Sequence, residues 1–66
     1  MKLTINGHIK DMNNAVNIAA IAGEFCTNNK NVIAEVNGTI LSRPDWNTLT
    51  LKEGDTIELV GFVGGG

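Results

Sequence analysis

The sequence has one cysteine, one proline, no tyrosine and few charged residues, and each shortage narrows the class of protein. With Cys26 as its single cysteine, the chain is unable to form an internal disulfide, although small extracellular domains usually depend on two or more. Asn6 interrupts the N-terminal segment before it reaches the roughly 7 to 15 apolar residues of a secretory signal. We therefore expect a cytoplasmic protein.

Charged residues make up 18% of the 66 residues and hydrophobic residues 42%, which is too apolar for a disordered chain. No run approaches the roughly 18 apolar residues that a membrane-spanning helix needs, so no membrane partner is expected. The five lysines and arginines are scattered and the net charge is −2, which argues against binding of nucleic acid. A chain this short forms one modest core, and we expect no active-site cleft of its own.

The sequence has few residues that could form a catalytic or metal site. A structural zinc ion takes four ligands, whereas this chain has one histidine and one cysteine far apart, so no metal is expected. His8 follows a predicted turn and is expected to be exposed, without an acid–base partner. Cys26 falls on an apolar helix stripe, which favours burial over a reactive persulfide carrier. Trp46 is favoured as a cover over the core, with a partner-binding anchor as the alternative.

The first half of the chain predicts two strands and a helix. Residues 2–6 alternate polar and apolar side chains and lead through the hairpin signal Asn6-Gly7 to a second strand at about 8–12. The two asparagines at 13–14 are expected to cap a helix that follows. The apolar stripe of that helix is Ile18, Ile21, Ala22, Phe25 and Cys26.

Three further strands are predicted at 32–36, 39–41 and 56–63 from their β-branched and alternating residues. A second Asn-Gly pair at 37–38 joins the first two of these in a hairpin. Residues 44–47 are expected to form a loop with a short helical segment, because proline and aspartate start such turns.

The predicted order β-β-α-β-β-β places one helix across one face of a mixed sheet of about five strands. This α+β arrangement is the β-grasp of ubiquitin-like proteins, and we expect it to occupy residues 1–63. Gly23 and Ala19 leave a smooth surface on the helix, which either admits a close partner backbone or is simply a tolerated surface glycine.

Residues 64–66 are three glycines, and we expect them to form a flexible tail beyond the domain. Folding gives no reason for such a tail, because glycine has the most conformational entropy to lose on ordering. Three glycines extend roughly 10 Å and fit a narrow channel. The reactive group is the carboxylate of Gly66, which a partner enzyme with ATP and magnesium would convert to an acyl adenylate. The alternative is a frayed or added glycine terminus.

The last predicted strand also suggests a docking patch beside the tail. If Ile57 and Leu59 face the helix, strand parity points Val60 and Phe62 to the opposite face. Exposed apolar residues at a functional terminus, here with Val63, predict a partner-binding surface. A bulge just before Phe62 would instead turn its side chain inward.

The segment LKEGDTIELVGFVGGG at 51–66 resembles the C-terminal signature of the ThiS family, the sulfur carriers of thiamine thiazole synthesis. The likeness spans the chain and includes its length, Asn37-Gly38, the Arg43 and Trp46 loop, and Gly54-Asp55. Many members have a proline before the loop arginine, where this chain has Ser42 and places Pro44 after the arginine.

The resemblance implies a sulfur carrier that is not itself an enzyme. An E1-like, ThiF-like adenylyltransferase would activate Gly66, and a sulfur donor such as a cysteine desulfurase would supply the sulfur of a thiocarboxylate. A ThiG-like thiazole synthase would then accept that sulfur. Gly64 and Gly65 would be the spacer. Two alternatives use the same tail: the small subunit of molybdopterin synthase, and a ubiquitin-like modifier joined to protein lysines through Gly66.

Overall fold

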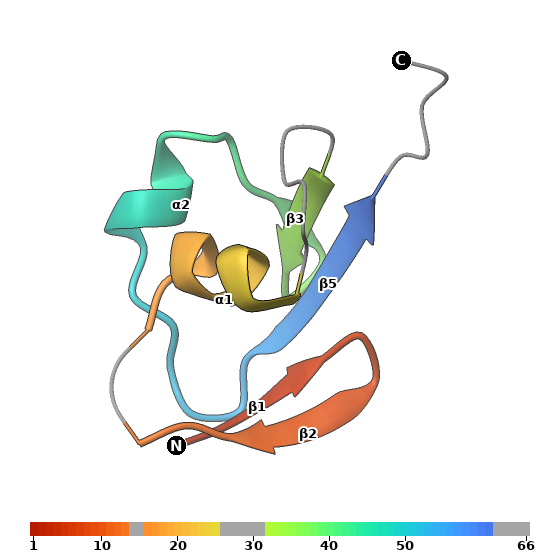
Figure 1. Ribbon diagram of the computed structural model, residues 1–66, viewed down its shortest axis with the longest axis vertical. Helices are drawn as coiled ribbons and strands as arrows, with labels where there is room; N and C mark the ends of the chain where they lie inside the picture. Colours follow the sequence, from red (N-terminus) through yellow and green to blue (C-terminus); the bar gives the residue numbers. More distant parts are fainter. Residues whose placement is uncertain (14–15, 26–31, 62–66) are drawn as a thin grey trace.

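The computed structural model describes residues 1–13, 16–25 and 32–61 (Figure 1). The elements in this part of the chain are strands β1 (Lys2–Ile5), β2 (His8–Asp11), β3 (Val32–Val36), β4 (Thr39–Ile40) and β5 (Thr56–Gly61), and helices α1 (Ile18–Phe25) and α2 (Asp45–Thr48). The predicted order is confirmed, with α2 at the expected short helical segment.

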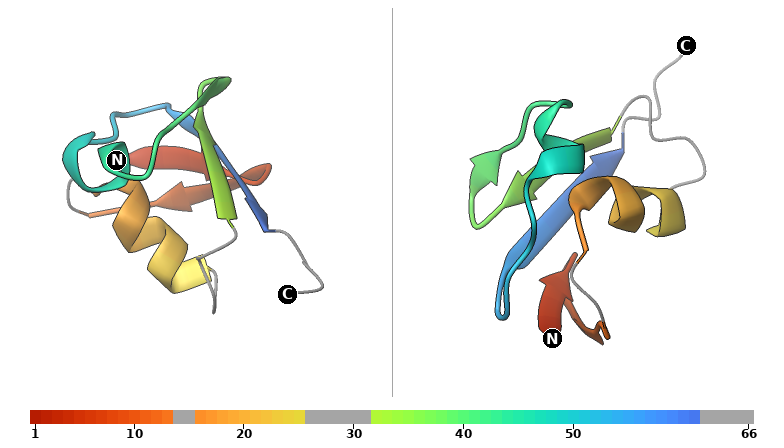
Figure 2. Two further views of the ribbon diagram at one scale, coloured as in Figure 1. Left: turned by 90° about the horizontal axis from the view of Figure 1, so that it is seen from above. Right: turned by 90° about the vertical axis from the view of Figure 1, so that its left-hand side faces the viewer.

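The strands form one mixed sheet in the order β2-β1-β5-β3-β4. The central strand β5 is parallel to its neighbour β1, with Thr4 opposite Thr56, and the other neighbours are antiparallel. Figures 1 and 2 show α1 and α2 on the same side of this sheet. The arrangement is the predicted β-grasp. Because segments from the two ends of the described chain pair at its centre, the sheet closes only when distant parts of the sequence meet.

The core lies between α1 and the inner face of the sheet. Burial alternates along β3 and β5, as a sheet covered on one side requires. The buried hydrophobic residues are Leu3, Ile5, Ile18, Ile21, Ala22, Val32, Ala34, Val36, Trp46, Leu51, Ile57 and Leu59. Three members of the predicted helix stripe are therefore confirmed. Cys26 and the side chain of Phe25 lie outside the described residues, so their predicted burial stays a prediction.

The helix begins later than the sequence predicted. Its capping side chain is Asn17, whose Oδ1 accepts a hydrogen bond from the backbone N–H of Ala20 at 2.9 Å. The prediction that Asn13 caps the helix is wrong, because Asn13 lies in a bend well before Ile18, and Asn14 is outside the described residues. The backbone before the helix is held instead by a hydrogen bond from the Leu51 N–H to the carbonyl that precedes Asn17.

Both Asn-Gly pairs form tight turns, and their asparagine side chains reach into β5. Asn6 and Asn37 have φ of 50° and 52°, and each is followed by a glycine of positive φ, the type I′ pattern. Asn6 Oδ1 accepts from the N–H of Leu59 at 2.8 Å, and Asn37 Oδ1 accepts from the N–H of Thr56 at 2.9 Å. The positive φ of Asn6 ends β1 at Ile5, one residue earlier than predicted. Its side chain then accepts the hydrogen bond of the Leu59 N–H, which lies beyond the residues of β5 that pair with β1.

Replacing Asn6 should destabilise the fold through this contact. We expect Asn6→Ala to lower the free energy of unfolding by about 1–3 kcal/mol, because the Leu59 N–H loses its acceptor and alanine is strained at positive φ. The matched control Asn6→Gly removes the oxygen but relieves the backbone, so it should fall between the parent and Asn6→Ala. Urea unfolding measures both. Parent-like stability of Asn6→Gly would contradict a role for the side-chain oxygen.

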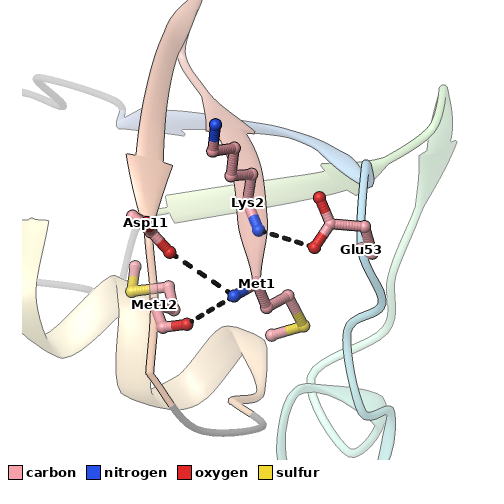
Figure 3. A network of polar contacts seen from close by, with 5 residues as sticks. All are labelled: Met1, Lys2, Asp11, Met12 and Glu53. Atoms are coloured by element: carbon pink, nitrogen blue, oxygen red, sulfur yellow. Dashed lines mark hydrogen bonds and ion pairs between the residues drawn. The ribbon is translucent and has the colours of Figure 1, made fainter.

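The start of β1 is fastened at the end of the sheet away from the C-terminus of β5 (Figure 3). The Met1 amine donates to the Met12 carbonyl at 2.8 Å and lies 3.4 Å from Asp11 Oδ1. The Lys2 N–H donates to Glu53 Oε1 at 2.9 Å. These contacts tie β1 both to the end of β2 and to the turn that leads into β5.

Asp55 is the buried charged residue of the described chain, and it closes the turn before β5. Its Oδ2 accepts from the Lys52 N–H at 2.8 Å, and its Oδ1 accepts from Asn37 Nδ2 at 3.0 Å. Burial by itself raises the pKa of Asp55, but these two hydrogen bonds and the charge of Lys52 outweigh it and lower the pKa from its ordinary value of 3.8.

Stability should therefore fall in acid. Because the pKa of Asp55 is lower in the folded chain, its contribution is full above the unfolded value of about 4 and disappears as the pH falls through the folded value. As the pH drops below about 4, we expect the unfolding free energy of Asp55→Asn to fall less steeply than that of the parent. Urea unfolding across a pH series tests this, with the exposed Asp45→Asn as the matched control. An unchanged acid slope in Asp55→Asn would contradict the assignment.

Candidate functional site

The strand that leads to the predicted tail is held on both sides. On the side of β3, strand β5 is paired up to its last residue, Gly61, which lies opposite Val32. Toward β1 the pairing reaches Ile57, and beyond it the side chain of Asn6 binds the Leu59 N–H at 2.8 Å. The chain is therefore anchored in the centre of the sheet up to the point where the tail segment begins.

The residues predicted to carry the chemistry follow this anchored strand. Phe62, Val63, Gly64, Gly65 and Gly66 lie outside the described residues. Their predicted roles as docking residues, spacer and reactive carboxylate stay predictions, as does the boundary between a domain at 1–63 and a tail at 64–66.

Val60 has the orientation that strand parity predicted. Ile57 and Leu59 are buried, whereas Val60 is 48% exposed on the opposite face. The register with β3 is continuous from Val36 to Val32, so the part of β5 that the structure describes contains no bulge. The parity on which the Phe62 prediction rests therefore holds up to Gly61.

The face of the sheet opposite the helices carries further residues that the sequence interpretation missed. Ile40 is 65% exposed, and the register places it opposite Glu35 of β3. Glu35 in turn lies opposite Glu58 of β5, and Ile33 lies opposite Val60. Alternation in Val32–Val36 could have indicated which side chains point outward. It could not show which of them become neighbours, because that depends on the register between strands.

Trp46 belongs to the core. It is 4% exposed, and the Arg43 guanidinium carbon lies 4.0 Å from the centre of its ring. A cation above an aromatic face is attracted by the ring electrons, so Arg43 covers the indole from the solvent side. The interpretation of Trp46 as a cover over the core is confirmed.

Two kinds of site are absent from the described residues. Residues 1–13, 16–25 and 32–61 contain no group of three or more His, Cys, Asp or Glu side chains placed to hold a metal ion, and no pocket is found among them. His8 is exposed at the start of β2, as expected. In the same ranges no helix has the length and apolar character needed to cross a membrane.

The model of the ThiS family matches residues 3–66. The chain belongs to the ThiS family. Among solved structures, this ThiS-family chain is similar to the thiamine biosynthesis protein ThiS of Geobacter metallireducens. The crystal structure of that protein has a TM-score of 0.83 and 30% identity, with all of both chains covered. Its solution structure has a TM-score of 0.79 and 32% identity, covering 100% of this chain and 88% of the other.

Two curated relatives extend the comparison. A thiazole synthase of Paramagnetospirillum magneticum is 32% identical over 66 residues, all of this ThiS-family chain but only 20% of that protein. The chain thus spans about one fifth of the length of that relative. The uncharacterized protein ycf40 of Trieres chinensis is 31% identical over 62 residues, covering 94% of this chain and 85% of the other. The resemblance to a ThiS sulfur carrier with a ubiquitin-like β-grasp fold is confirmed.

Proposed function

We propose that the chain carries sulfur for thiamine biosynthesis as a thiocarboxylate on Gly66. The observation that carries the proposal is the match to the ThiS family, which runs through residue 66 and so includes the glycine tail. Similarity to a thiamine biosynthesis protein along the whole chain supports the same pathway. In this proposal the chain is a co-substrate of partner enzymes rather than an enzyme.

The first step is activation by an E1-like, ThiF-like adenylyltransferase. A carboxylate oxygen of Gly66 attacks the α-phosphorus of ATP, the bond to pyrophosphate breaks, and an acyl adenylate forms. The enzyme supplies magnesium and the basic side chains that stabilise the phosphate charge. Activation is required because an ionised carboxylate is a poor electrophile and offers no good leaving group.

The second step replaces an oxygen atom with sulfur. A donor such as a cysteine desulfurase supplies sulfur as a protein persulfide, whose outer sulfur attacks the carbonyl carbon of the adenylate and displaces AMP. A thiol then cleaves the acyl disulfide that forms and is itself oxidised to a disulfide. The product is a thiocarboxylate at Gly66. Between Gly61, the last residue anchored in β5, and this group lie at most about 18 Å of chain, enough to enter a partner's active site while the sheet stays outside.

A ThiG-like thiazole synthase is the proposed acceptor of the sulfur. In the Paramagnetospirillum magneticum protein named thiazole synthase, a segment similar to this whole chain makes up 20% of the length. Joining two interacting parts in one polypeptide raises their effective concentration. A carrier that is not joined to its acceptor in one polypeptide has to reach it by docking, and a surface beside the tail would serve that purpose.

We assign that docking role to Val60, Phe62 and Val63. Replacing Phe62 with glutamate should weaken binding of the adenylyltransferase by roughly tenfold or more, because an aromatic anchor would be replaced by a charge. The domain should stay folded, and circular dichroism would check this. Leu49→Glu, at a 39% exposed apolar residue after α2, is the matched control. Parent-like affinity of Phe62→Glu for both the adenylyltransferase and the thiazole synthase would contradict the assignment.

Intact-mass spectrometry tests the proposed function. The chain is incubated with the adenylyltransferase, ATP, magnesium and a sulfur donor. The expected product is the free chain with one oxygen replaced by sulfur, and it should then support thiazole formation. Covalent attachment to larger proteins would indicate a ubiquitin-like modifier instead. Sulfur transfer to molybdopterin synthesis alone would indicate the small subunit of that synthase.

A further inference from the structure

Two glutamates face each other on the open side of the sheet. Glu35 of β3 lies directly opposite Glu58 of β5, and burial alternates so that their neighbours in each strand point into the core. Residues opposite each other in an antiparallel pair have Cβ atoms about 4.5–5.5 Å apart. Like charges in this position destabilise a sheet.

The described part of the chain does not balance this repulsion. The ion pair found there joins the Met1 amine to Asp11, at the far end of β1 and β2. Among residues 1–13, 16–25 and 32–61, no ion pair includes Glu35 or Glu58. A like-charge pair that no ion pair of the described residues offsets is the kind of departure that functional surfaces show.

Apolar residues lie beside the two glutamates on the same face of the sheet. Ile33 and Val60 form the next outward pair toward the tail, and Ile40 lies opposite Glu35 on β4. Val60 is 48% exposed and Ile40 is 65% exposed. A partner that covers these apolar groups would exclude water around the glutamates and so strengthen their attraction to its cations.

We infer that this surface, defined by Glu35, Glu58, Ile33, Ile40 and Val60 and here named the acidic face, docks the adenylating enzyme through lysine or arginine side chains. The inference rests on the proposed function and adds the charge of the partner's surface to it. An enzyme that holds ATP phosphates uses basic side chains, so a positive field around its site is expected from the chemistry. Gly66 follows Val60 by six residues, about 20 Å of chain, which allows docking and tail insertion together.

The test compares charge-neutral variants on two sides of the molecule. Glu35→Gln with Glu58→Gln removes both charges and keeps the side-chain size. Glu24→Gln, at an exposed position on α1, makes the same change on the side that carries the helices. Dissociation constants for the adenylating enzyme are measured without ATP at low and high salt. The double variant should bind about tenfold more weakly at low salt and less than about threefold more weakly at high salt. Glu24→Gln should stay within about twofold of the parent.

A second readout separates docking from folding. Because the substitution removes a repulsion, the double variant should unfold at the parent's temperature or up to a few degrees higher. Weaker binding by a chain of equal or greater stability would support the acidic face. Equal affinity and equal salt dependence in parent and double variant would overturn it. Charge-dependent binding to the thiazole synthase alone would also overturn it. The same holds if the parent does not bind the adenylating enzyme.

Sulfur exchange is scored separately from binding. If the double variant binds weakly but forms the full thiocarboxylate at saturating enzyme, both the acidic face and the proposed function stand. Charge-dependent binding with no sulfur gain in the parent would support the acidic face and contradict the proposed function. Sulfur gain in the parent, with unchanged affinity in the double variant, would support the proposed function and contradict the acidic face.

Discussion

Adding one alanine after Gly66 is expected to abolish thiocarboxylate formation. The extension turns the reacting carboxylate of Gly66 into a peptide bond and moves the new carboxylate about 3.5 Å further on. A displacement of even about 1 Å from productive geometry can slow an enzymatic step about 100-fold, so the sulfur gain should fall at least that far. Intact-mass spectrometry over a time course measures it.

The control for the extension is Cys26→Ala, which removes the chain's single thiol and leaves the tail unchanged. It should gain sulfur at the parent rate, because the proposed chemistry does not use the thiol. The extended chain should also unfold like the parent, since the addition follows the anchored strand. Continued sulfur gain in the extended chain, with loss in Cys26→Ala, would contradict a carboxylate mechanism and indicate a persulfide on Cys26.

Truncating Ile57 should have the largest effect on stability. Ile57 is fully buried at the centre of the sheet, where it pairs with Ile5 on one side and Val36 on the other. We expect Ile57→Ala to lower the unfolding free energy by about 2–5 kcal/mol, from the lost apolar contact and the cavity left behind. In so small a domain, whose total stability lies near the low end of about 5–15 kcal/mol, a substantial fraction of the chain would unfold.

The matched control on the same strand is Val60→Ala, whose side chain is half-exposed on the other face. It should change the unfolding free energy by less than about 1 kcal/mol. Urea unfolding of both variants would measure the difference between the two faces of β5. Similar losses for Ile57→Ala and Val60→Ala would contradict the assignment of inner and outer faces.

Patterns local in the sequence predicted most of the fold. The alternation around Ile57 and Leu59 identified the buried face of the last strand, because side chains in a strand point to opposite sides in turn. The Asn-Gly pairs identified both hairpins, because the turns need two residues of positive φ. The helix stripe was also found, but its start was not. Several asparagines precede the apolar residues, and the one that becomes the cap, Asn17, follows a carbonyl that accepts a hydrogen bond from the distant Leu51.

Contacts between distant segments could not be predicted in this way. Asn6 binds the Leu59 N–H across 53 residues, and Glu35 lies opposite Glu58 only because of the register between β3 and β5. A shift of one residue in that register would put a buried residue opposite each glutamate. The tail depended on a different kind of evidence. Its proposed role rests on the identity of its residues and on the family, because glycine leaves no hydrophobic pattern to interpret.

Fragmentation of the sulfur-loaded chain would locate the sulfur atom. After incubation with the adenylyltransferase, ATP, magnesium and a sulfur donor, the chain is digested and its peptides are weighed. We predict that the peptide ending in Gly66 gains one sulfur in exchange for one oxygen, while the peptide containing Cys26 keeps its mass. Sulfur added to the Cys26 peptide, with an unmodified Gly66 peptide, would contradict the thiocarboxylate.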